Sequence, residues 1–262
     1  MLDRSQITNA VDAGGGVLRL EPSWVPRSFM IPGERLKLHP RDLYALGGHR
    51  GGINERWFSS TTNADNGPGT PADEGLSYVR LDNGSRFLLK DAVDTAGDLL
   101  LGSVVMEREK GWNLLCKFFD NMGPIPHHMH QTDAQAKLLG RKGKPDRCFP
   151  KPAKPFEQTE RDGYREDSAK ELTVLPKQTI TIKDAAAYGI ILTQGYGRFG
   201  TLPVSTPSMI RFGQMTEDEL FVTEPAALQG IKIENLSATD PLVILKHFGP
   251  GNPEAEGLKR KS

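Results

Sequence analysis

A histidine-rich run near the middle of the chain has the clearest capacity for chemistry. The run is Pro126-His127-His128-Met129-His130, and we expect it to lie on a strand. Alternate residues of a strand point to the same side, so His128 and His130 would face one way and His127 the other. Two neutral imidazoles on one face can share a divalent ion if one or two further ligands complete the site. A polar strand edge without metal would show the same spacing.

Turn-forming segments enclose this run. Gly123-Pro124-Ile125-Pro126 precedes it and fixes a turn into the strand, and Gly143-Lys144-Pro145-Asp146 follows it. The second turn brings a carboxylate back toward the same region. Lys144 is a candidate for binding a substrate phosphate, although a lysine in an exposed loop commonly does no more than interact with solvent.

A second cluster lies nearer the N-terminus, in a segment that mixes glycine, charged and aromatic residues. Glu55, Arg56 and Trp57 are consecutive there. An arginine beside an aromatic ring suits a phosphate or the face of a sugar, which makes Arg56 and Glu55 candidate substrate-binding residues. The alternative is a surface ion pair packed on an anchoring tryptophan.

The composition argues against several kinds of partner. The chain has 33 basic and 33 acidic side chains, so no net field favours nucleic acid or an anionic membrane surface.

No apolar run approaches the roughly 20 residues that cross a bilayer. The N-terminus lacks the apolar core of a secretion signal, so we expect a cytoplasmic protein. Cys116 and Cys148 have no metal-binding spacing and are expected to be reduced thiols.

Short apolar runs separated by glycine and proline predict an all-β protein. The 28 glycines and 19 prolines interrupt the long stretches that amphipathic helices would need. The runs expected to form strands are rich in β-branched or aromatic residues. They are residues 86–91, 99–105, 112–119, 171–175, 179–182, 189–193, 219–223, 231–235 and 242–248.

Few other elements are expected. Residues 133–139 predict one short helix, and the polar, turn-rich residues 60–75 predict a long surface loop that could also cover a site. The glycines between Gly195 and Gly200 resemble a dinucleotide loop only in spacing. They lie between two strand-like runs with no helix after them, so a β-turn is expected.

The residues around the histidine run resemble a known family. The strand Leu114-Leu115-Cys116-Lys117-Phe118-Phe119-Asp120, followed by the histidines and by Gly143-Lys144-Pro145-Asp146, is similar to the metal-binding stretch of type I phosphomannose isomerases. That family has an apolar strand with an internal lysine ending in aspartate, then Gln-x-His, a helix and a Lys-Pro-Glu-like turn. The resemblance places His128, His130 and Asp146 at the positions of its metal ligands.

Residues 218–245 resemble the second conserved motif of cupins at large. In that motif a strand leads into a Pro-Gly turn, a ligand histidine and a final strand. The matching turn here is residues 224–229, so Gln229 stands at the histidine position. A glutamine can offer its carbonyl oxygen, but it binds first-row metal ions more weakly than imidazole does. His247, on the last predicted strand, would supply an imidazole if its side chain points inward.

The resemblance implies a cupin barrel, also called a double-stranded β-helix or jelly roll, with few short helices. The length leaves open one elaborated barrel or two fused ones. We expect an N-terminal half at residues 1–160 that contains the candidate metal site, a C-terminal cupin half at 161–250, and a flexible tail at 251–262.

The implied activity is that of a metal-dependent isomerase that interconverts an aldose and a ketose of a sugar or sugar phosphate through an enediolate. The cofactor would be a divalent ion of zinc, manganese, nickel or iron. A cupin dioxygenase with non-haem iron could use the same His128, His130 and Asp146. A non-catalytic, sugar-binding or structural cupin is the third possibility, which Gln229 favours. Strand edges of such barrels commonly pair, so a homodimer is expected.

Overall fold

The computed structural model describes residues 2–124, 137, 138, 140, 168–249, 251 and 252. The chain divides into two units, one formed by residues 1–122 and 166–262 and the other by residues 123–165. The histidine run with His128 and His130, together with Lys144, Asp146, Cys148 and nearly all of the expected helix at 133–139, lies outside the described residues.

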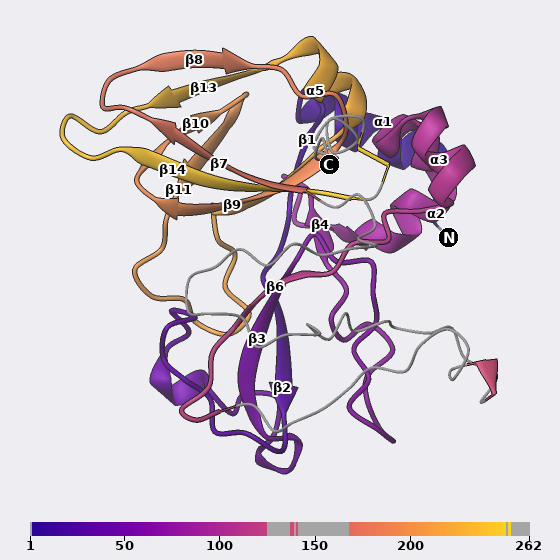
Figure 1. Cartoon of the computed structure of the whole chain (residues 1–262), viewed down its shortest axis with the longest axis vertical. Helices are drawn as coiled ribbons and strands as arrows, with labels where there is room; N and C mark the ends of the chain where they lie inside the picture. Colours follow the sequence, from indigo (N-terminus) through magenta and orange to yellow (C-terminus); the bar gives the residue numbers. More distant parts are fainter. Residues whose placement is uncertain (1, 125–136, 139, 141–167, 250, 253–262) are drawn as a thin grey trace, which may run out of the picture. The chain divides into compact units, whose positions relative to one another are not determined.

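Antiparallel sheets dominate this unit (Figure 1). The largest sheet has the order β1-β12-β9-β14-β7, and a second has the order β11-β10-β13-β8. A third sheet has the order β2-β3-β6, and β4 pairs with β5. The strands are β1 (Val17–Arg19), β2 (Ser23–Arg27), β3 (Gly52–Phe58), β4 (Tyr78–Arg80), β5 (Arg86–Leu88), β6 (Cys116–Phe119), β7 (Ser168–Val174), β8 (Thr179–Ile182), β9 (Tyr188–Gln194), β10 (Tyr196–Phe199), β11 (Leu202–Ser205), β12 (Glu219–Val222), β13 (Ile231–Asn235) and β14 (Leu242–Phe248).

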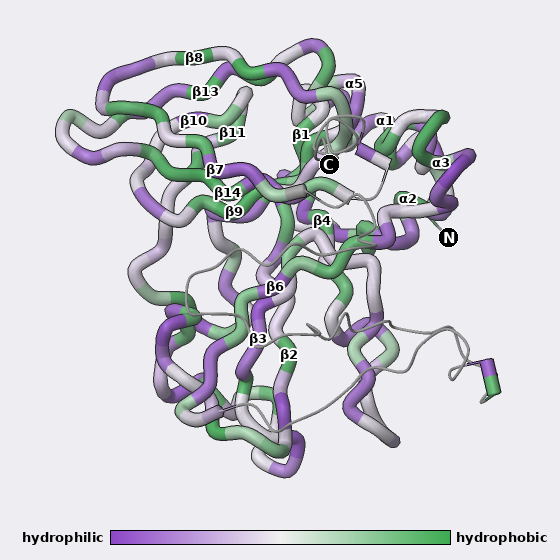
Figure 2. The backbone as a smooth tube through the Cα atoms, viewed as in Figure 1, coloured by the Kyte–Doolittle hydropathy of each residue, from purple (hydrophilic) through white to green (hydrophobic). Residues whose placement is uncertain are grey.

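The main hydrophobic core joins the two larger sheets. It includes Ile190 of β9 and Ile244 of β14 from one sheet, and Phe199 of β10 and Ile233 of β13 from the other. Hydrophobic residues recur along these strands (Figure 2), as expected when one side of each strand faces a core. The space between these sheets is therefore filled with apolar side chains.

The helices are α1 (Arg4–Ala13), α2 (Leu89–Leu101), α3 (Ser103–Glu109) and α5 (Glu224–Gln229), with short 3-10 helices η1 (Pro40–Asp42) and η2 (Gly48–Arg50). Buried residues of α1 and α2 form a second core beside the large sheet, whereas those of α5 belong to the main core. Asp3 caps α1 through a reciprocal pair of hydrogen bonds with Gln6. Leu89 and Leu100 of α2 pack in one cluster with Phe221 of β12, on the opposite side of the strand from the main core. None of the helices in the described part of the chain has the length and apolarity needed to cross a bilayer.

The C-terminal strands agree with the sequence predictions. The runs 179–182, 231–235 and 242–248 are strands with the predicted bounds, and 171–175, 189–193 and 219–223 match β7, β9 and β12 closely. Residues 60–75 contain no helix or strand, as predicted for a loop. The glycine-rich stretch 195–200 is not the predicted β-turn, because Tyr196–Phe199 is strand β10 and the turn into β11 comes after it.

Other predictions in this unit were also wrong in part or in whole. Only residues 86–88 of the run 86–91 are a strand, because α2 begins at Leu89. Residues 99–105 are helical in α2 and α3 instead of extended, and only 116–119 of the run 112–119 are a strand. A short apolar run does not by itself distinguish a buried strand from a buried helix. The expected turn at 224–229 is the helix α5.

A glycine on β9 allows the large sheet and the end of β3 to approach closely. A Cβ atom on Gly189 would lie 2.0 Å from Nε2 of His247 and 2.3 Å from Oγ of Ser59. Both neighbouring side chains are buried and have little room to move. Gly189 is therefore a packing requirement at this point of the sheet.

We expect the substitution Gly189→Ala to destabilise the protein by about 1–3 kcal/mol, because the added methyl overpacks a closed site. Gly48→Ala is the matched control, since a Cβ there meets no atom within 4 Å. Its effect should be below about 0.5 kcal/mol. Chemical denaturation of the two variants measures the difference, and equal stabilities would contradict the packing argument.

Candidate functional site

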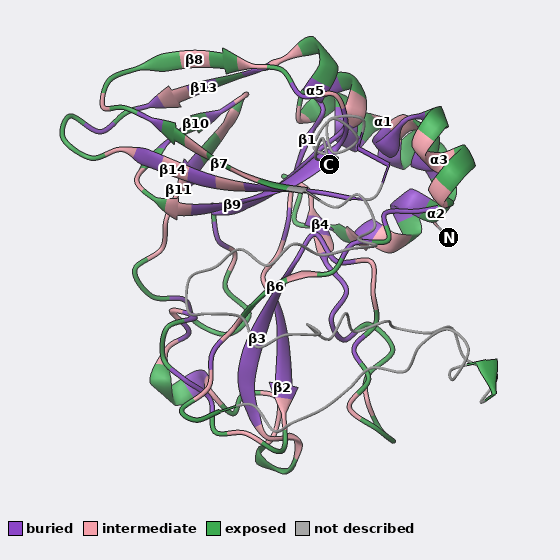
Figure 3. Ribbon diagram, viewed as in Figure 1, coloured by how far each residue is buried: buried purple, intermediate pink, exposed green. Residues whose placement is uncertain are grey.

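Strand β3 separates two clusters of charged side chains. All seven of its residues are buried (Figure 3). Successive side chains of a strand point to opposite sides, so Glu55 and Trp57 share one face while Arg56 and Phe58 share the other. Strand β2 pairs with one edge of β3 and β6 with the other.

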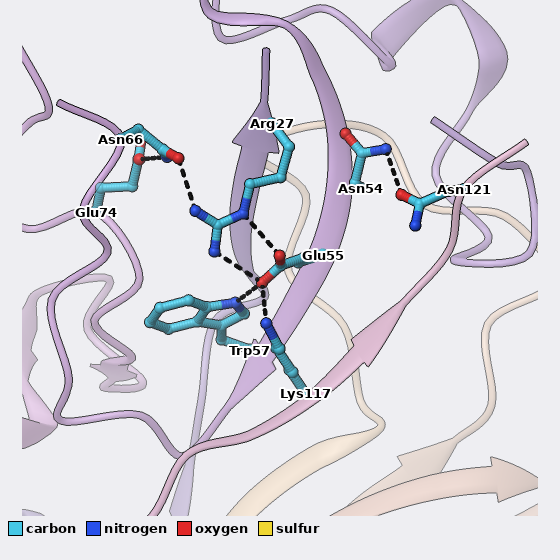
Figure 4. A network of polar contacts seen from close by, with 8 residues as sticks. All are labelled: Arg27, Asn54, Glu55, Trp57, Asn66, Glu74, Lys117 and Asn121. Atoms are coloured by element: carbon cyan, nitrogen blue, oxygen red, sulfur yellow. Dashed lines mark hydrogen bonds and ion pairs between the residues drawn. The ribbon is translucent and has the colours of Figure 1, made fainter. Parts of the chain in front are cut away.

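The carboxylate of Glu55 is the centre of a hydrogen-bond network drawn from three strands (Figure 4). Arg27 of β2 donates from Nε to Oε1 at 2.7 Å and from a terminal nitrogen to Oε2 at 3.1 Å. The indole of Trp57 donates to Oε2 at 2.6 Å, and Nζ of Lys117 on β6 donates to the same oxygen at 2.8 Å. Both carboxylate oxygens are thus engaged by donors from within the protein.

The charges around Glu55 keep it ionised in spite of its burial. Its side chain is 2% exposed, and burial alone would raise the pKa of a carboxyl group. The hydrogen bonds and charges of Arg27 and Lys117 outweigh that effect and lower the pKa of Glu55 below its ordinary value. Glu55 is therefore a fixed negative charge that holds two cations in place.

The loop at residues 60–75 is attached to this network. The other terminal nitrogen of Arg27 donates to Oδ1 of Asn66 at 2.7 Å, and Asn66 donates to Glu74 at 2.6 Å. Glu74 in turn binds Arg50. Gly75 lies so close to the Trp57 ring that a Cβ would be 2.7 Å from it. The loop is thereby packed and hydrogen-bonded against the Glu55 face.

Lys117 is the member of the network best placed to reach a ligand. Its side chain is 34% exposed, compared with 14% for Arg27 and 2% for Glu55. The ammonium lies 5.7 Å from the centre of the Trp57 ring and 5.2 Å from that of Phe119. An ammonium has three donors, so the bond to Glu55 leaves donors available for an oxygen-rich molecule.

On the other face of β3, Arg56 is buried between two acidic residues of the segment that begins β12. It donates to the two oxygens of Asp218 at 2.7 and 2.8 Å and to Glu219 at 3.2 Å. One guanidinium cannot fully compensate two buried carboxylates. Burial raises the pKa of Glu219 to about 7. The negative charge of Asp218 adds to this effect, and the positive charge of Arg56 opposes it. Asp218 has the shorter, bidentate contact with Arg56.

Ser59 and His247 complete this buried cluster. Ser59 follows β3 with a φ of 48° and donates its backbone N–H to Glu219 at 3.1 Å. Among the described residues, neither the Ser59 hydroxyl nor Nε2 of His247 has a hydrogen-bond partner. Burial lowers the pKa of His247 to about 3, so the imidazole is neutral. His247 faces Ser59 and Gly189, whereas Ile244 and Phe248 of the same strand belong to the main core.

The predicted site residues that the structure describes do not gather at one point. Glu55 and Arg56 belong to different clusters on opposite faces of β3, and both are buried, so they do not form a surface ion pair. Gln229 is exposed at the end of α5, whereas His247 is buried. The described residues contain no group of three or more His, Cys, Asp or Glu that could hold a metal ion.

Sequence reasoning missed most partners of the candidate residues. Lys117 had a visible signal, because it is a charged residue inside the apolar run Leu114 to Phe119. The pairing of Trp57 with Glu55 could be inferred from their i, i+2 spacing. Arg27 carries no such signal, and its contact with Glu55 follows only from the register that places Val25 opposite Glu55.

The fold is similar to that of known enzymes, although the sequence is not. No model of a protein family matches the chain, and no curated protein matches it. Crystal structures of variants of phosphomannose isomerase from Salmonella typhimurium match 90% of this chain and 100% of theirs. Two of them have TM-scores of 0.53 and 0.54 at identities of 10% and 7%.

This likeness shows the fold alone. The predicted fold is confirmed as mostly antiparallel sheets with few short helices, of the cupin type found in phosphomannose isomerase. In the described part of the chain the sheets do not close into a barrel.

Replacing Glu55 should be among the most destabilising single changes in this unit. Glu55→Ala leaves Arg27 and the Trp57 indole without their buried acceptor, and we expect a loss of about 3–5 kcal/mol. Asp94→Ala, which removes only the exposed partner of Lys90 on α2, should have almost no effect. Urea denaturation compares the two, and a loss below about 1 kcal/mol for Glu55→Ala would contradict the role assigned to this carboxylate.

Proposed function

We propose that this chain is a metal-dependent isomerase of a sugar or sugar phosphate. It would interconvert an aldose and a ketose by moving a proton between adjacent carbons. The fold shared with phosphomannose isomerase supports the proposal, as does the resemblance of residues 114–146 to the metal-binding stretch of that family. The observation that carries it is the position of Lys117, whose side chain is 34% exposed and bonded to Glu55, on the strand that precedes the histidine run in the sequence.

In this proposal Lys117 binds and orients the substrate. The ammonium of Lys117 donates a hydrogen bond to Glu55, and the rings of Trp57 and Phe119 lie near it. The donors not used by Glu55 hydrogen-bond a substrate oxygen on which negative charge develops as the enediolate forms. The neighbouring cation Arg27 is engaged by Glu55 and Asn66, so it supports the site by fixing Glu55.

The proposal assigns the divalent ion to His128, His130 and Asp146. Glu55 is unsuited to the role because both of its oxygens already accept hydrogen bonds. His247 has the chemistry of a ligand, being neutral with an unpartnered nitrogen among the described residues, but it faces Ser59 and Gly189. The exposed Gln229 is not needed for this assignment. When bound, the ion would polarise the substrate carbonyl and favour loss of the adjacent proton.

The test is an assay of the interconversion of mannose 6-phosphate and fructose 6-phosphate. We expect turnover by the wild-type protein and a decrease of about 10²- to 10⁴-fold in kcat for Lys117→Met, because a positioned donor is lost. Methionine keeps the apolar packing on Trp57 and Phe119, and thermal unfolding would confirm that the variant folds. Lys90→Met, on the exposed face of α2, is the matched control and should retain full activity.

Two results would contradict the proposal. One is a wild-type protein that turns over neither this pair nor other aldose and ketose phosphates with the metal ions named above. The other is a folded Lys117→Met variant as active as wild type. The first result would favour a non-catalytic, sugar-binding cupin, whereas the second would leave an isomerase whose site does not include Lys117.

A further inference from the structure

A cavity lies in the C-terminal part of the unit, formed by residues that take no part in the Glu55 network. Its volume is about 580 Å³, within the range of small-molecule sites. It is located where the connection between β9 and β10, the end of β11 and the segment before β14 meet. Its lining residues are Gln194, Gly195, Tyr196, Ser205, Thr206 and Asp240.

Backbone packing brings these segments together. Gly195 has a φ of 86°, and a Cβ there would lie 2.6 Å from the carbonyl oxygen of Pro241. The connection between β9 and β10 can therefore lie directly against the residue that follows Asp240. Thr206 donates its backbone N–H to the carbonyl of Gly195 at 3.0 Å, which holds the end of β11 at the same place.

Asp240 is fixed in position before any ligand binds. Its backbone carbonyl accepts from the amide of Asn235 at 2.9 Å, and its backbone N–H donates to Ser237 Oγ at 2.9 Å. Its side chain accepts from Thr239 at 2.8 Å and from Ser237 at 3.4 Å. Both of these hydrogen bonds are accepted by Oδ2, so neither of them uses Oδ1. A carboxylate held in this way is preorganised as an acceptor.

The remaining lining groups define what the cavity can bind. Tyr196 is 50% exposed, so it presents an aromatic surface with a polar end. Gln194 offers an amide with both donors and an acceptor. The Ser205 hydroxyl donates to Glu217 at 2.9 Å and can still accept, whereas the Thr206 hydroxyl oxygen is buried. None of the described residues that line the cavity is a lysine, arginine or histidine, and Asp240 is negative. These features suit a ring with many hydroxyl groups and disfavour a phosphate.

We propose that this cavity is a binding site for a neutral carbohydrate, with Tyr196 packing against the sugar ring and Asp240 and Gln194 binding its hydroxyls. The site is separate from the proposed isomerase site, which would take a sugar phosphate through Lys117. It gives the protein a way to hold an uncharged sugar whether or not it catalyses isomerisation. The two proposals can therefore fail independently.

The test is a titration of the full-length protein with D-mannose, D-glucose and D-galactose. Binding is measured by calorimetry or by NMR of the amide signals. At least one hexose should saturate the protein below about 50 mM, and Tyr196→Ala should weaken that binding by about tenfold or more. Tyr196→Phe keeps the ring and should bind within about threefold of wild type. Tyr44→Ala removes a tyrosine of similar exposure far from the lining residues in sequence and should bind as wild type does.

Changing the charge of the sugar or of residue 240 provides an independent test of the same site. D-mannose 6-phosphate should compete poorly at this cavity, and Asp240→Asn should weaken binding of the neutral sugar. The Lys117→Met variant should keep the Tyr196-dependent binding of the hexose. The proposal is overturned if no hexose saturates the protein, if Tyr196→Ala binds as tightly as wild type, or if the phosphorylated sugar binds more tightly than the neutral one in a Tyr196-dependent manner.

Discussion

A carboxylate buried inside a protein must be surrounded by donors, and the N-terminal sheet of this protein is organised around one such group. Glu55 receives hydrogen bonds from Arg27 on β2, from Trp57 on its own strand and from Lys117 on β6. An ionised carboxyl in that position would be costly to bury if any of these partners were absent. The same requirement that stabilises the sheet fixes Lys117 at its edge with part of its length exposed.

The opposite face of β3 also buries carboxylates, but it has fewer cations to compensate their charge. There one arginine serves two carboxylates, so Glu219 has a raised pKa while Asp218 makes the shorter contacts. The cluster ties the end of β3 to β12, through the bond from Ser59 to Glu219. One strand with charged side chains on both faces thus links the N-terminal sheet to the large C-terminal sheet. This explains why Glu55 and Arg56, adjacent in sequence, have unrelated roles.

Sequence reasoning was most successful where local pattern determines structure. The strands 179–182, 231–235 and 242–248 combine β-branched residues with flanking turn formers, and all three were predicted with their bounds. The helix α2 was missed, although Leu89, Ala92, Val93, Ala96 and Leu100 have helical spacing and are buried. Strand β2 was missed because it contains Pro26, which lies at a bulge where its absent N–H is tolerated.

The site was less predictable than the fold because its contacts depend on pairing between distant strands. The sequence indicated Glu55 and the histidine run, but not that Arg27 would lie across from Glu55 or that Arg56 would turn to a separate cluster. The resemblance to a cupin motif placed Gln229 in a turn, but this segment is a helix with an exposed end. Long-range register decides such contacts, and no local pattern in one sequence encodes it.

The central proposal is that the segment with His128 and His130, which follows β6 in the sequence, binds a divalent metal ion. It is tested most directly by elemental analysis of protein purified without added metal, for the wild type and the double variant His128→Ala, His130→Ala. The account predicts about one equivalent of zinc, manganese, nickel or iron in the wild type and its loss in the double variant. The control His39→Ala, His49→Ala should retain the metal. Absence of metal from the wild type even after incubation with these ions, or equal metal in the double variant, would contradict the account.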